Sequence, residues 1–402
     1  MKQLVKVTAL SVVVASSLFA SGYKIPETSL NALALGSANV AHSSKSADCA
    51  YYNPANMSFM QDENSLEVGV IGVYLSPTNY DGARTQEGVD IDAKSERFLL
   101  PTLHYVSGAL AQDFHIGFSM VVPAGLTKRW SESPAVDRAK EFSLEVVEFN
   151  PTLSYSISKQ LSVAFGVRML YSKGVVKSES SASRDMEGES VDFGYNLALA
   201  YKPTSSLEFG VTYRSNVDLT EEGDAKLYIG DATVYDGGSS VTIPVPALLN
   251  VALAYSFNDA TTFEFVYERN YWSAYDKLDF NYRSTIPAIL QPSMDDPITK
   301  DWKDSNAYRF GVTHKMEKYT FMGGFVIDKT AIREENVSFE LPDADSMAYS
   351  VGVRYAMEKN LEFGVALLYS KKESRDVQND TVDGEFSNAN VTMASVAMAY
   401  KF

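Results

Sequence analysis

The residues that most often carry enzyme chemistry are sparse in this chain of 402 residues. Its four histidines, His42, His104, His115 and His314, lie in no nucleophile motif and in no H-E-x-x-H zinc motif. Nucleophilic catalysis needs a base and an orienting group beside the nucleophile. The single cysteine, Cys49, cannot form an internal disulfide, and small buried cysteines are commoner than reactive ones. We therefore expect no enzyme activity, no cofactor and no metal site.

The first twenty residues have the features of a secretory signal peptide. A basic start is followed by an apolar run at residues 7–14 and by small residues up to Ala20. That run is too short to cross a bilayer as a helix. We expect cleavage after Ala20, with the next position as the alternative. Loss of Lys2 and Lys6 would take the formal net charge from −16 to −18, and so acidic a chain is not expected to bind nucleic acid.

Strict alternation of side chains dominates the rest of the sequence. Large apolar residues alternate with Gly, Ala, Ser or Asn from Leu161 to Ser172 and again from Val191 to Lys202. In a soluble β-sandwich the second face is usually rich in charge, whereas here it is small and polar. The apolar face often ends in Tyr or Phe, which is typical of an outer-membrane barrel. The same pattern recurs at residues 114–122, 153–157, 207–213, 249–257, 263–267, 308–314, 349–357, 361–369 and 394–402.

The connections between these segments support the same fold. Short turns alternate with long polar stretches, as periplasmic turns and extracellular loops do. The expected fold is an all-β, transmembrane antiparallel barrel of about fourteen strands. We expect it at residues 64–402, after the signal peptide at 1–20 and a separate segment at 21–63. The long stretches lie at residues 76–97, 127–140, 172–189, 219–240, 281–300, 329–346 and 371–387.

The segment at residues 21–63 shows no strand alternation, yet it is too apolar for a disordered tail. Its last part, "AYYNPANMSFM", fits neither a helix nor a strand, because Pro54 removes a backbone donor and restricts Asn53. A barrel of this width leaves a lumen that is either water-filled or plugged. Irregular backbone survives at membrane depth only when protein buries it. The segment is therefore predicted to be a plug, here called the hatch, with a periplasmic tail as the alternative.

Several short motifs together resemble one family, the long-chain fatty acid and aromatic hydrocarbon transporters of the Gram-negative outer membrane, or FadL/TodX family. The start Ser21-Gly22-Tyr23 resembles the family's mature N-terminus, and Asn53-Pro54-Ala55 resembles its hatch motif. Val122-Pro123-Ala124-Gly125 resembles the end of its third strand. Further matching pieces, in the same order, are Leu35-Gly36-Ser37-Ala38, Tyr213-Arg214-Ser215, Tyr271-Trp272-Ser273, Asp328 and residues 337–343.

The resemblance implies passive uptake of a hydrophobic small molecule through the outer membrane. The third and fourth loops would offer a landing groove, with Leu227 and Ile229 on the fourth loop as candidates, unless a strand simply continues there. The ligand would then enter a pocket lined partly by the hatch, and Ser21, Gly22, Tyr23 and Ile25 would shift to release it. If the ligand is a carboxylate, a cation should meet its head. The candidates are Lys177, Lys303 and Arg309, with solvated surface cations as the alternative.

The third strand suggests where the ligand leaves. It alternates from Phe114 to Val122 and then meets Pro123-Ala124-Gly125. Proline cannot donate to a strand ladder, and a closed barrel has no free edge for it. Either the strand ends here, or Val122, Pro123, Ala124 and Gly125 form a kink that opens a lateral exit, which the segment "YYNPANMSFM" would have to back.

The C-terminus and the surroundings of the barrel are also predicted from the sequence. The C-terminal strand ending in Phe402 resembles the signal that the barrel-assembly machinery reads. Membrane lipid and lipopolysaccharide should surround the barrel, and we expect a monomer. The alternatives are a porin or structural barrel for small polar solutes and a barrel lipid hydrolase.

Overall fold

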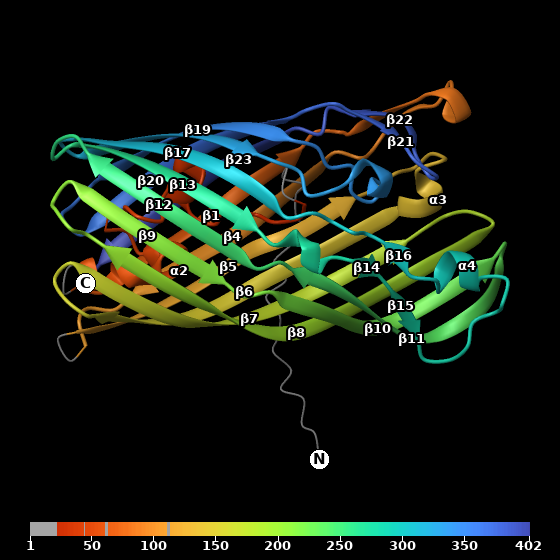
Figure 1. Cartoon of the computed structure of the whole chain (residues 1–402), viewed down its shortest axis with the longest axis horizontal. Coiled ribbons are helices and arrows are strands. Elements are labelled where there is room, and N and C mark those ends of the chain that lie inside the picture. The colour runs from red at the N-terminus through yellow and green to blue at the C-terminus, as the bar shows by residue number, and fades with distance from the viewer. Residues whose placement is uncertain (1–21, 44, 61–62, 111–112) are drawn as a thin grey trace, which may run out of the picture.

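One antiparallel sheet curls into a barrel along most of the chain (Figure 1). The computed structural model describes residues 22–43, 45–60, 63–110 and 113–402, so the expected signal peptide and Ser21 lie outside the described residues. The barrel closes because β1 (Ser65–Leu75) pairs along its whole length with β23 (Val391–Lys401). No helix in the described ranges is long and apolar enough to cross a membrane.

Two strands of the wall are each interrupted once. β9 (Leu207–Arg214) continues as β10 (Val217–Ile229), and β11 (Ala232–Val245) continues as β12 (Leu248–Ser256). With each pair taken as one strand, the wall has fourteen strands, which confirms the prediction. The remaining wall strands are β4 (Glu96–Val106), β5 (Phe114–Lys128), β6 (Glu141–Ser156), β7 (Leu161–Lys177), β8 (Ala182–Tyr201), β13 (Thr261–Asn270), β17 (Ser305–Met316), β18 (Tyr319–Asp328), β19 (Ser346–Ala356) and β20 (Leu361–Lys372).

The two faces of the wall carry the residues that the alternation predicted. Large apolar side chains such as Phe193, Val351 and Leu367 point outward and are more than half exposed. Positions between them are buried against the hatch or small, for example Ala198 and Gly352. An outward apolar band around a partly polar interior is what a barrel needs in lipid.

Two of the seven stretches predicted to be loops are mostly strand. Residues 172–189 belong largely to β7 and β8, and residues 219–240 belong to the β10–β11 hairpin, which turns at Gly230 with a φ of 56°. Above the membrane the outward face of these strands meets water instead of lipid, so polar residues stand where large apolar ones would mark a membrane strand. The inner face stays apolar, with Leu219 and Leu227 buried, and the backbone pairing continues.

The other loops carry small elements of their own at one end of the barrel (Figure 1). A separate four-stranded sheet joins the first and last of these loops. The elements are β2 (Asn79–Gly82), η2 (Arg84–Gln86), β3 (Asp90–Asp92), α3 (Val136–Ala139), η3 (Trp272–Ala274), β14 (Lys277–Leu278), β15 (Phe280–Tyr282), α4 (Gln291–Met294), β16 (Ile298–Thr299), η4 (Glu334–Asn336), β21 (Arg375–Gln378) and β22 (Asp383–Ser387).

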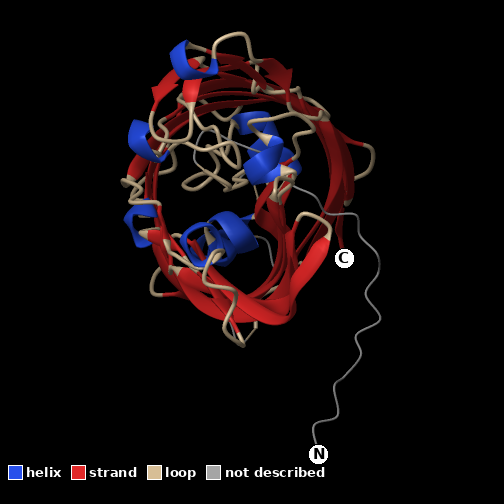
Figure 2. Ribbon diagram, turned by 90° about the vertical axis from the view of Figure 1, so that its right-hand side faces the viewer, coloured by secondary structure: helices blue, strands red, loops and turns tan. Residues whose placement is uncertain are grey.

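The hatch fills the inside of the ring, where Figure 2 shows its helices. It contains α1 (Leu30–Leu35), α2 (Cys49–Tyr52) and η1 (Pro54–Phe59), so "AYYNPANMSFM" is two short helical turns rather than irregular chain. The restriction that Pro54 imposes explains the break between them. Asn53 ends α2 and caps η1, because its Oδ1 accepts from Ala55 N at 3.2 Å. The plug that the sequence predicted therefore has local order of its own.

Candidate functional site

A groove of about 310 Å³ opens among the loops at the end of the barrel opposite the short turns. Arg184 lines it with its guanidinium 4.7 Å from the centre of the Phe280 ring, and donates to Ser293 O at 2.7 Å. Arg138 also lines it, and neither arginine makes an ion pair within the described residues. Asp137 and Glu340 lie on the same groove. Its apolar lining is Phe142, Val176, Ala182, Leu278, Phe280, Met294 and Ile298.

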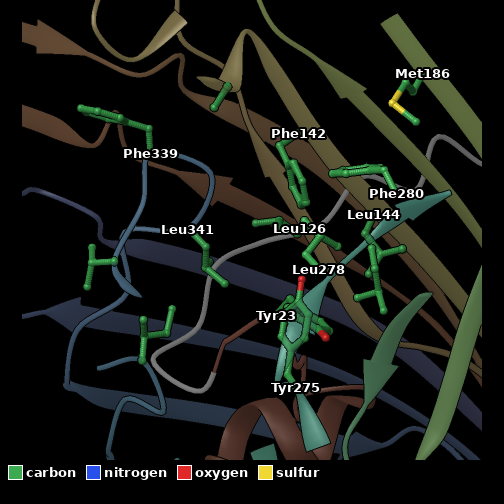
Figure 3. Packing of buried hydrophobic residues seen from close by; sticks show 14 of the residues in the cluster. Tyr23, Leu126, Phe142, Leu144, Met186, Tyr275, Leu278, Phe280, Phe339 and Leu341 are labelled. Carbon is green, nitrogen blue, oxygen red and sulfur yellow. The ribbon is translucent and has the colours of Figure 1, made fainter. Parts of the chain in front are cut away.

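Beneath the groove lies a large cluster of buried hydrophobic residues. Figure 3 shows Phe142 and Phe280 near Leu126 and Leu144, with Tyr23 of the hatch below them. Phe142 lines both the groove and a cavity of about 20 Å³ inside this cluster, which is too small for more than a water molecule. A ligand that enters this place must therefore displace side chains.

Two tryptophans hold the first described residues of the hatch. Their rings, Trp272 and Trp302, lie 4.9 Å apart and pack on Tyr23 at 4.8 and 5.9 Å. Both indole Nε1 atoms are buried and have no hydrogen-bond acceptor in the described part of the chain. Lys300 lines the same small cavity, is 7 % exposed, and forms no ion pair among the described residues. Buried donors without acceptors are rare in proteins and call for an explanation.

The hatch also replaces part of the barrel wall. Strands β4 and β5 pair only from Leu103 to Val106 on β4, opposite Gly117 to Met120 on β5. Above that point β5 pairs with the hatch instead, since Ile25 N donates to Pro123 O at 2.8 Å and Gly125 N donates to Tyr23 O at 2.7 Å.

The kink predicted in β5 appears in the pairing of β5 with β6. Between β5 and β6 the register shifts from Val121 to Ala124, so Val122 and Pro123 form a bulge. The segment that backs the kink is not "YYNPANMSFM", as the sequence suggested, but Tyr23 to Ile25. A three-residue pairing carries no periodic signal, so the pattern could not identify it.

Side chains fix these hatch residues to the far wall. Lys24 forms an ion pair with Glu268 of β13, and its Nζ donates to Asn270 Oδ1 at 2.9 Å. The Tyr23 hydroxyl donates to Pro244 O at 2.5 Å, and Gly22 N donates to Asp343 Oδ2 at 3.4 Å.

The three predicted cations do not come together. Lys177 forms an ion pair with Asp185 at 3.1 Å on the rim, and Lys303 is exposed in a loop. Arg309 is not a solvated surface cation, because it is buried and contacts Glu268 at 3.0 Å and Glu27 at 3.5 Å. Within the described ranges, Arg138, Arg184 and Lys300 line the groove or the small cavity and form no ion pair. Nothing in the sequence distinguished these three, because pairing depends on loop geometry.

Leu227 and Ile229 do not form a loop tip. Both lie in β10, Leu227 is fully buried in the hydrophobic cluster, and Ile229 is 39 % exposed beside the turn. Leu227 is therefore not accessible as a landing groove, and the structure has the alternative, a strand that continues through both positions.

The body of the hatch is tied to the wall at many points. Glu264 of β13 accepts three backbone N–H groups, from Val40, Ala41 and His42, at 2.6 to 2.9 Å. Asn53 donates to Val40 O at 2.8 Å and to Leu199 O of β8 at 3.2 Å. Pro54 and Ala55 are buried in the same region. These contacts connect the body of the hatch directly to β13 and β8.

The chain is similar to known outer-membrane proteins in sequence and in fold. A family model described as outer membrane protein transport protein (OMPP1/FadL/TodX) matches residues 11–402. The outer membrane protein P1 of Haemophilus influenzae is 22 % identical over 453 residues, covering 95 % of each chain. A long-chain fatty acid transport protein of Escherichia coli is 21 % identical, covering 92 % of this chain and 91 % of the other. A crystal structure of a Pseudomonas aeruginosa FadL homologue has a TM-score of 0.82 at 16 % identity, covering 94 % and 99 %.

Proposed function

Because the chain belongs to the OMPP1/FadL/TodX family, and so is an outer-membrane transporter of hydrophobic compounds in a Gram-negative bacterium, we propose that its ligand is a long hydrocarbon chain with a carboxylate head. The family includes transporters of long-chain fatty acids and of aromatic hydrocarbons. The choice between them rests on the chemistry of the buried cavity, since the fold is common to both.

The observation that carries the proposal is the set of unpaired donors around that cavity. Trp272 Nε1 and Trp302 Nε1 are buried without acceptors among the described residues, and Lys300, which lines the cavity together with Trp302, forms no ion pair in the same part of the chain. A toluene-like ligand would leave both indole donors unpaired and would give Lys300 no counter-ion. A carboxylate would accept from them, and hydrogen bonds to a charged acceptor contribute about 1.5–3 kcal/mol. Glu340 lines the same cavity and would oppose an anion unless Lys300 lies between them.

The proposed path begins in the groove. Arg138 and Arg184 attract the carboxylate while the apolar wall holds the chain. Phe142 lies at both the groove and the buried cavity, so a movement of its ring would join them. The ligand then displaces Tyr23, and with it the backbone pairing of Tyr23 to Ile25 with β5.

Release would be lateral, through the wall between β4 and β5. Once Tyr23 to Ile25 leave β5, no backbone pairing among the described residues joins β4 and β5 between Leu103 and Met120 below and the bond from Lys94 N to Arg129 O above. Val122, Pro123, Ala124 and Gly125 border this opening, and a hydrophobic ligand would pass through it into lipid without crossing water. The anchored body of the hatch favours this route over one straight to the periplasm.

The test compares ligands of two classes on paired variants. Lys300→Met keeps the length of the side chain and removes the ammonium, and Trp302→Phe keeps an aromatic ring, although a smaller one, and removes the indole donor. We expect binding of oleate to weaken about tenfold, the effect of losing one interaction of about 1.4 kcal/mol, while binding of toluene and of a long alkane stays unchanged. Lys303→Met, on an exposed side chain, is the matched control. Equal losses for oleate and the hydrocarbons would contradict the carboxylate assignment.

A further inference from the structure

Two neighbouring turns at the periplasmic end repeat the same three residues. The β17–β18 turn contains Met316-Glu317-Lys318, and the β19–β20 turn contains Met357-Glu358-Lys359. They lie side by side, because Ala356 N donates to Lys318 O at 2.8 Å. All six side chains are exposed, and their charged groups form no ion pair within the described residues. The transport path does not use them, since it runs through the other end of the barrel.

A groove of about 700 Å³ begins above these turns on the outer face of the wall. It is almost wholly apolar and crosses β18, β19, β20, β23 and β1. Tyr319 and Tyr355 lie at its edge nearest the turns, as aromatic residues do at a membrane interface. Its floor and sides are formed by Val68, Val70, Val353, Phe363, Val365, Val396 and Met398.

This face must be covered by lipid, because it belongs to the outward apolar band of an outer-membrane barrel. Short turns mark the periplasmic side, so the lipid belongs to the periplasmic leaflet. The turns determine which head group fits there. Each offers a carboxylate and an ammonium on adjacent residues, so a head group with one phosphate and one primary ammonium can pair with both signs.

We propose that the two Met-Glu-Lys turns and the groove form a binding site for one zwitterionic phospholipid with an ethanolamine head. The phosphate pairs with Lys318 and Lys359, the ammonium pairs with Glu317 and Glu358, and one acyl chain lies in the groove. The exposed side chains of Met316 and Met357, each about half exposed, cover the junction of head and chain.

Other turns at this end lack the combination. The β6–β7 turn offers Lys159 without an acidic neighbour, and the β12–β13 turn offers Asp259 without a basic one. Head-group recognition through both charges is therefore confined, among these turns, to the wall that also carries the groove. A lipid bound here would be independent of the transport ligand and of its proposed route.

The experiment is native mass spectrometry of the full-length protein, delipidated in detergent and then given dioleoyl phosphatidylethanolamine or dioleoyl phosphatidylglycerol. We expect one phosphatidylethanolamine to bind at least tenfold more tightly than phosphatidylglycerol. Glu317→Gln with Glu358→Gln should abolish that preference, and Lys318→Gln with Lys359→Gln should weaken both lipids.

A substitution that fills the groove provides a second, independent test of the site. Val365→Trp should reduce binding of both lipids, whereas Lys159→Gln and Val167→Trp, on β7 and its turn, should leave binding unchanged. The heat-shifted electrophoretic mobility of each variant reports whether the barrel is folded. Equal affinity for the two lipids, retention of detergent only, or the same loss in the control variants would each overturn the proposal.

Discussion

At the residue scale, the first described residue of the hatch shows how tightly the N-terminal segment is fitted. Gly22 has a φ of +67°, and a β-carbon placed there would lie 2.8 Å from atoms of both Trp272 and Trp302. The sequence pointed to Gly22 and Tyr23 through a family motif. It could not point to Trp302, Lys300 or Arg184, because their roles arise from loops that meet only in the fold.

Gly22→Ala should therefore destabilise the protein twice, through backbone strain and through overpacking. Left-handed backbone costs about 1–2 kcal/mol for an L-residue, and overpacking about 1–3 kcal/mol more. Gly230→Ala is the matched control, since Gly230 also has positive φ but no atom within 4 Å of the added carbon. Urea unfolding of both variants separates the two effects, and equal losses would show that the tryptophans move aside.

Asp343, in the loop between β18 and β19, gives a pH-dependent prediction. Burial raises the pKa of its carboxyl, although Lys372 and the hydrogen bond from Thr330 at 2.6 Å act in the opposite direction. The folded protein then holds a proton on Asp343 at pH values where the unfolded chain has lost it. Stability from this group is present below the unfolded pKa and is lost as pH rises through the folded one.

Asp343→Asn should remove that pH-dependent part. We expect the free energy of unfolding of the variant to fall less than that of the parent as pH rises from about 4, the unfolded pKa of an aspartate. Urea unfolding at half-unit steps of pH measures it. A parallel pair of curves would mean that Lys372 keeps the carboxylate ionised throughout.

At the element scale, the sequence predicted the kink of β5 but not its partner. Pro123 has no backbone N–H to donate, and glycine in a strand often marks a bulge, so Pro123 and Gly125 predict an interrupted ladder. The bulge at Val122 and Pro123 lies at that place. The pairing of Tyr23 to Ile25 with β5 was not predicted, because three residues are too few to show alternation. A strand that continues through Leu227 and Ile229 was the alternative to a landing groove, and the structure shows that strand, since both residues lie in β10.

Replacing Pro123-Ala124-Gly125 with Val-Thr-Val should restore a continuous ladder along β5. The new residues can donate to a ladder with β4 that competes with Tyr23 to Ile25. We expect oleate binding to persist and uptake into cells to stop, because the lateral opening is closed. The parental rate of uptake, with the new ladder confirmed by structure, would contradict lateral release.

At the scale of the whole molecule, strict alternation and the succession of short and long connections predicted a closed barrel of about fourteen strands, and the apolar segment without alternation at residues 21–63 predicted a filled lumen. Such a prediction is possible for a membrane barrel because every side chain that faces lipid has to be apolar and every strand has to be paired. The loops do not face lipid and show no such pattern, so the groove among the loops and the small buried cavity could only be located in the structure. The two routes differ in which part of the hatch moves when the ligand passes.

A cross-link between hatch and wall separates the two possible movements. The β-carbon of Ala38 lies 2.9 Å from one placed at Gly311 of β17, so Ala38→Cys with Gly311→Cys needs a shift of about 1 Å to reach the mean disulfide spacing of about 3.8 Å. Cys49 is buried and should not interfere. If only residues 22–25 move, the oxidised variant takes up oleate at the parental rate. If the ligand passes straight to the periplasm, the hatch body must leave its place, and oxidation should stop uptake until a reductant restores it.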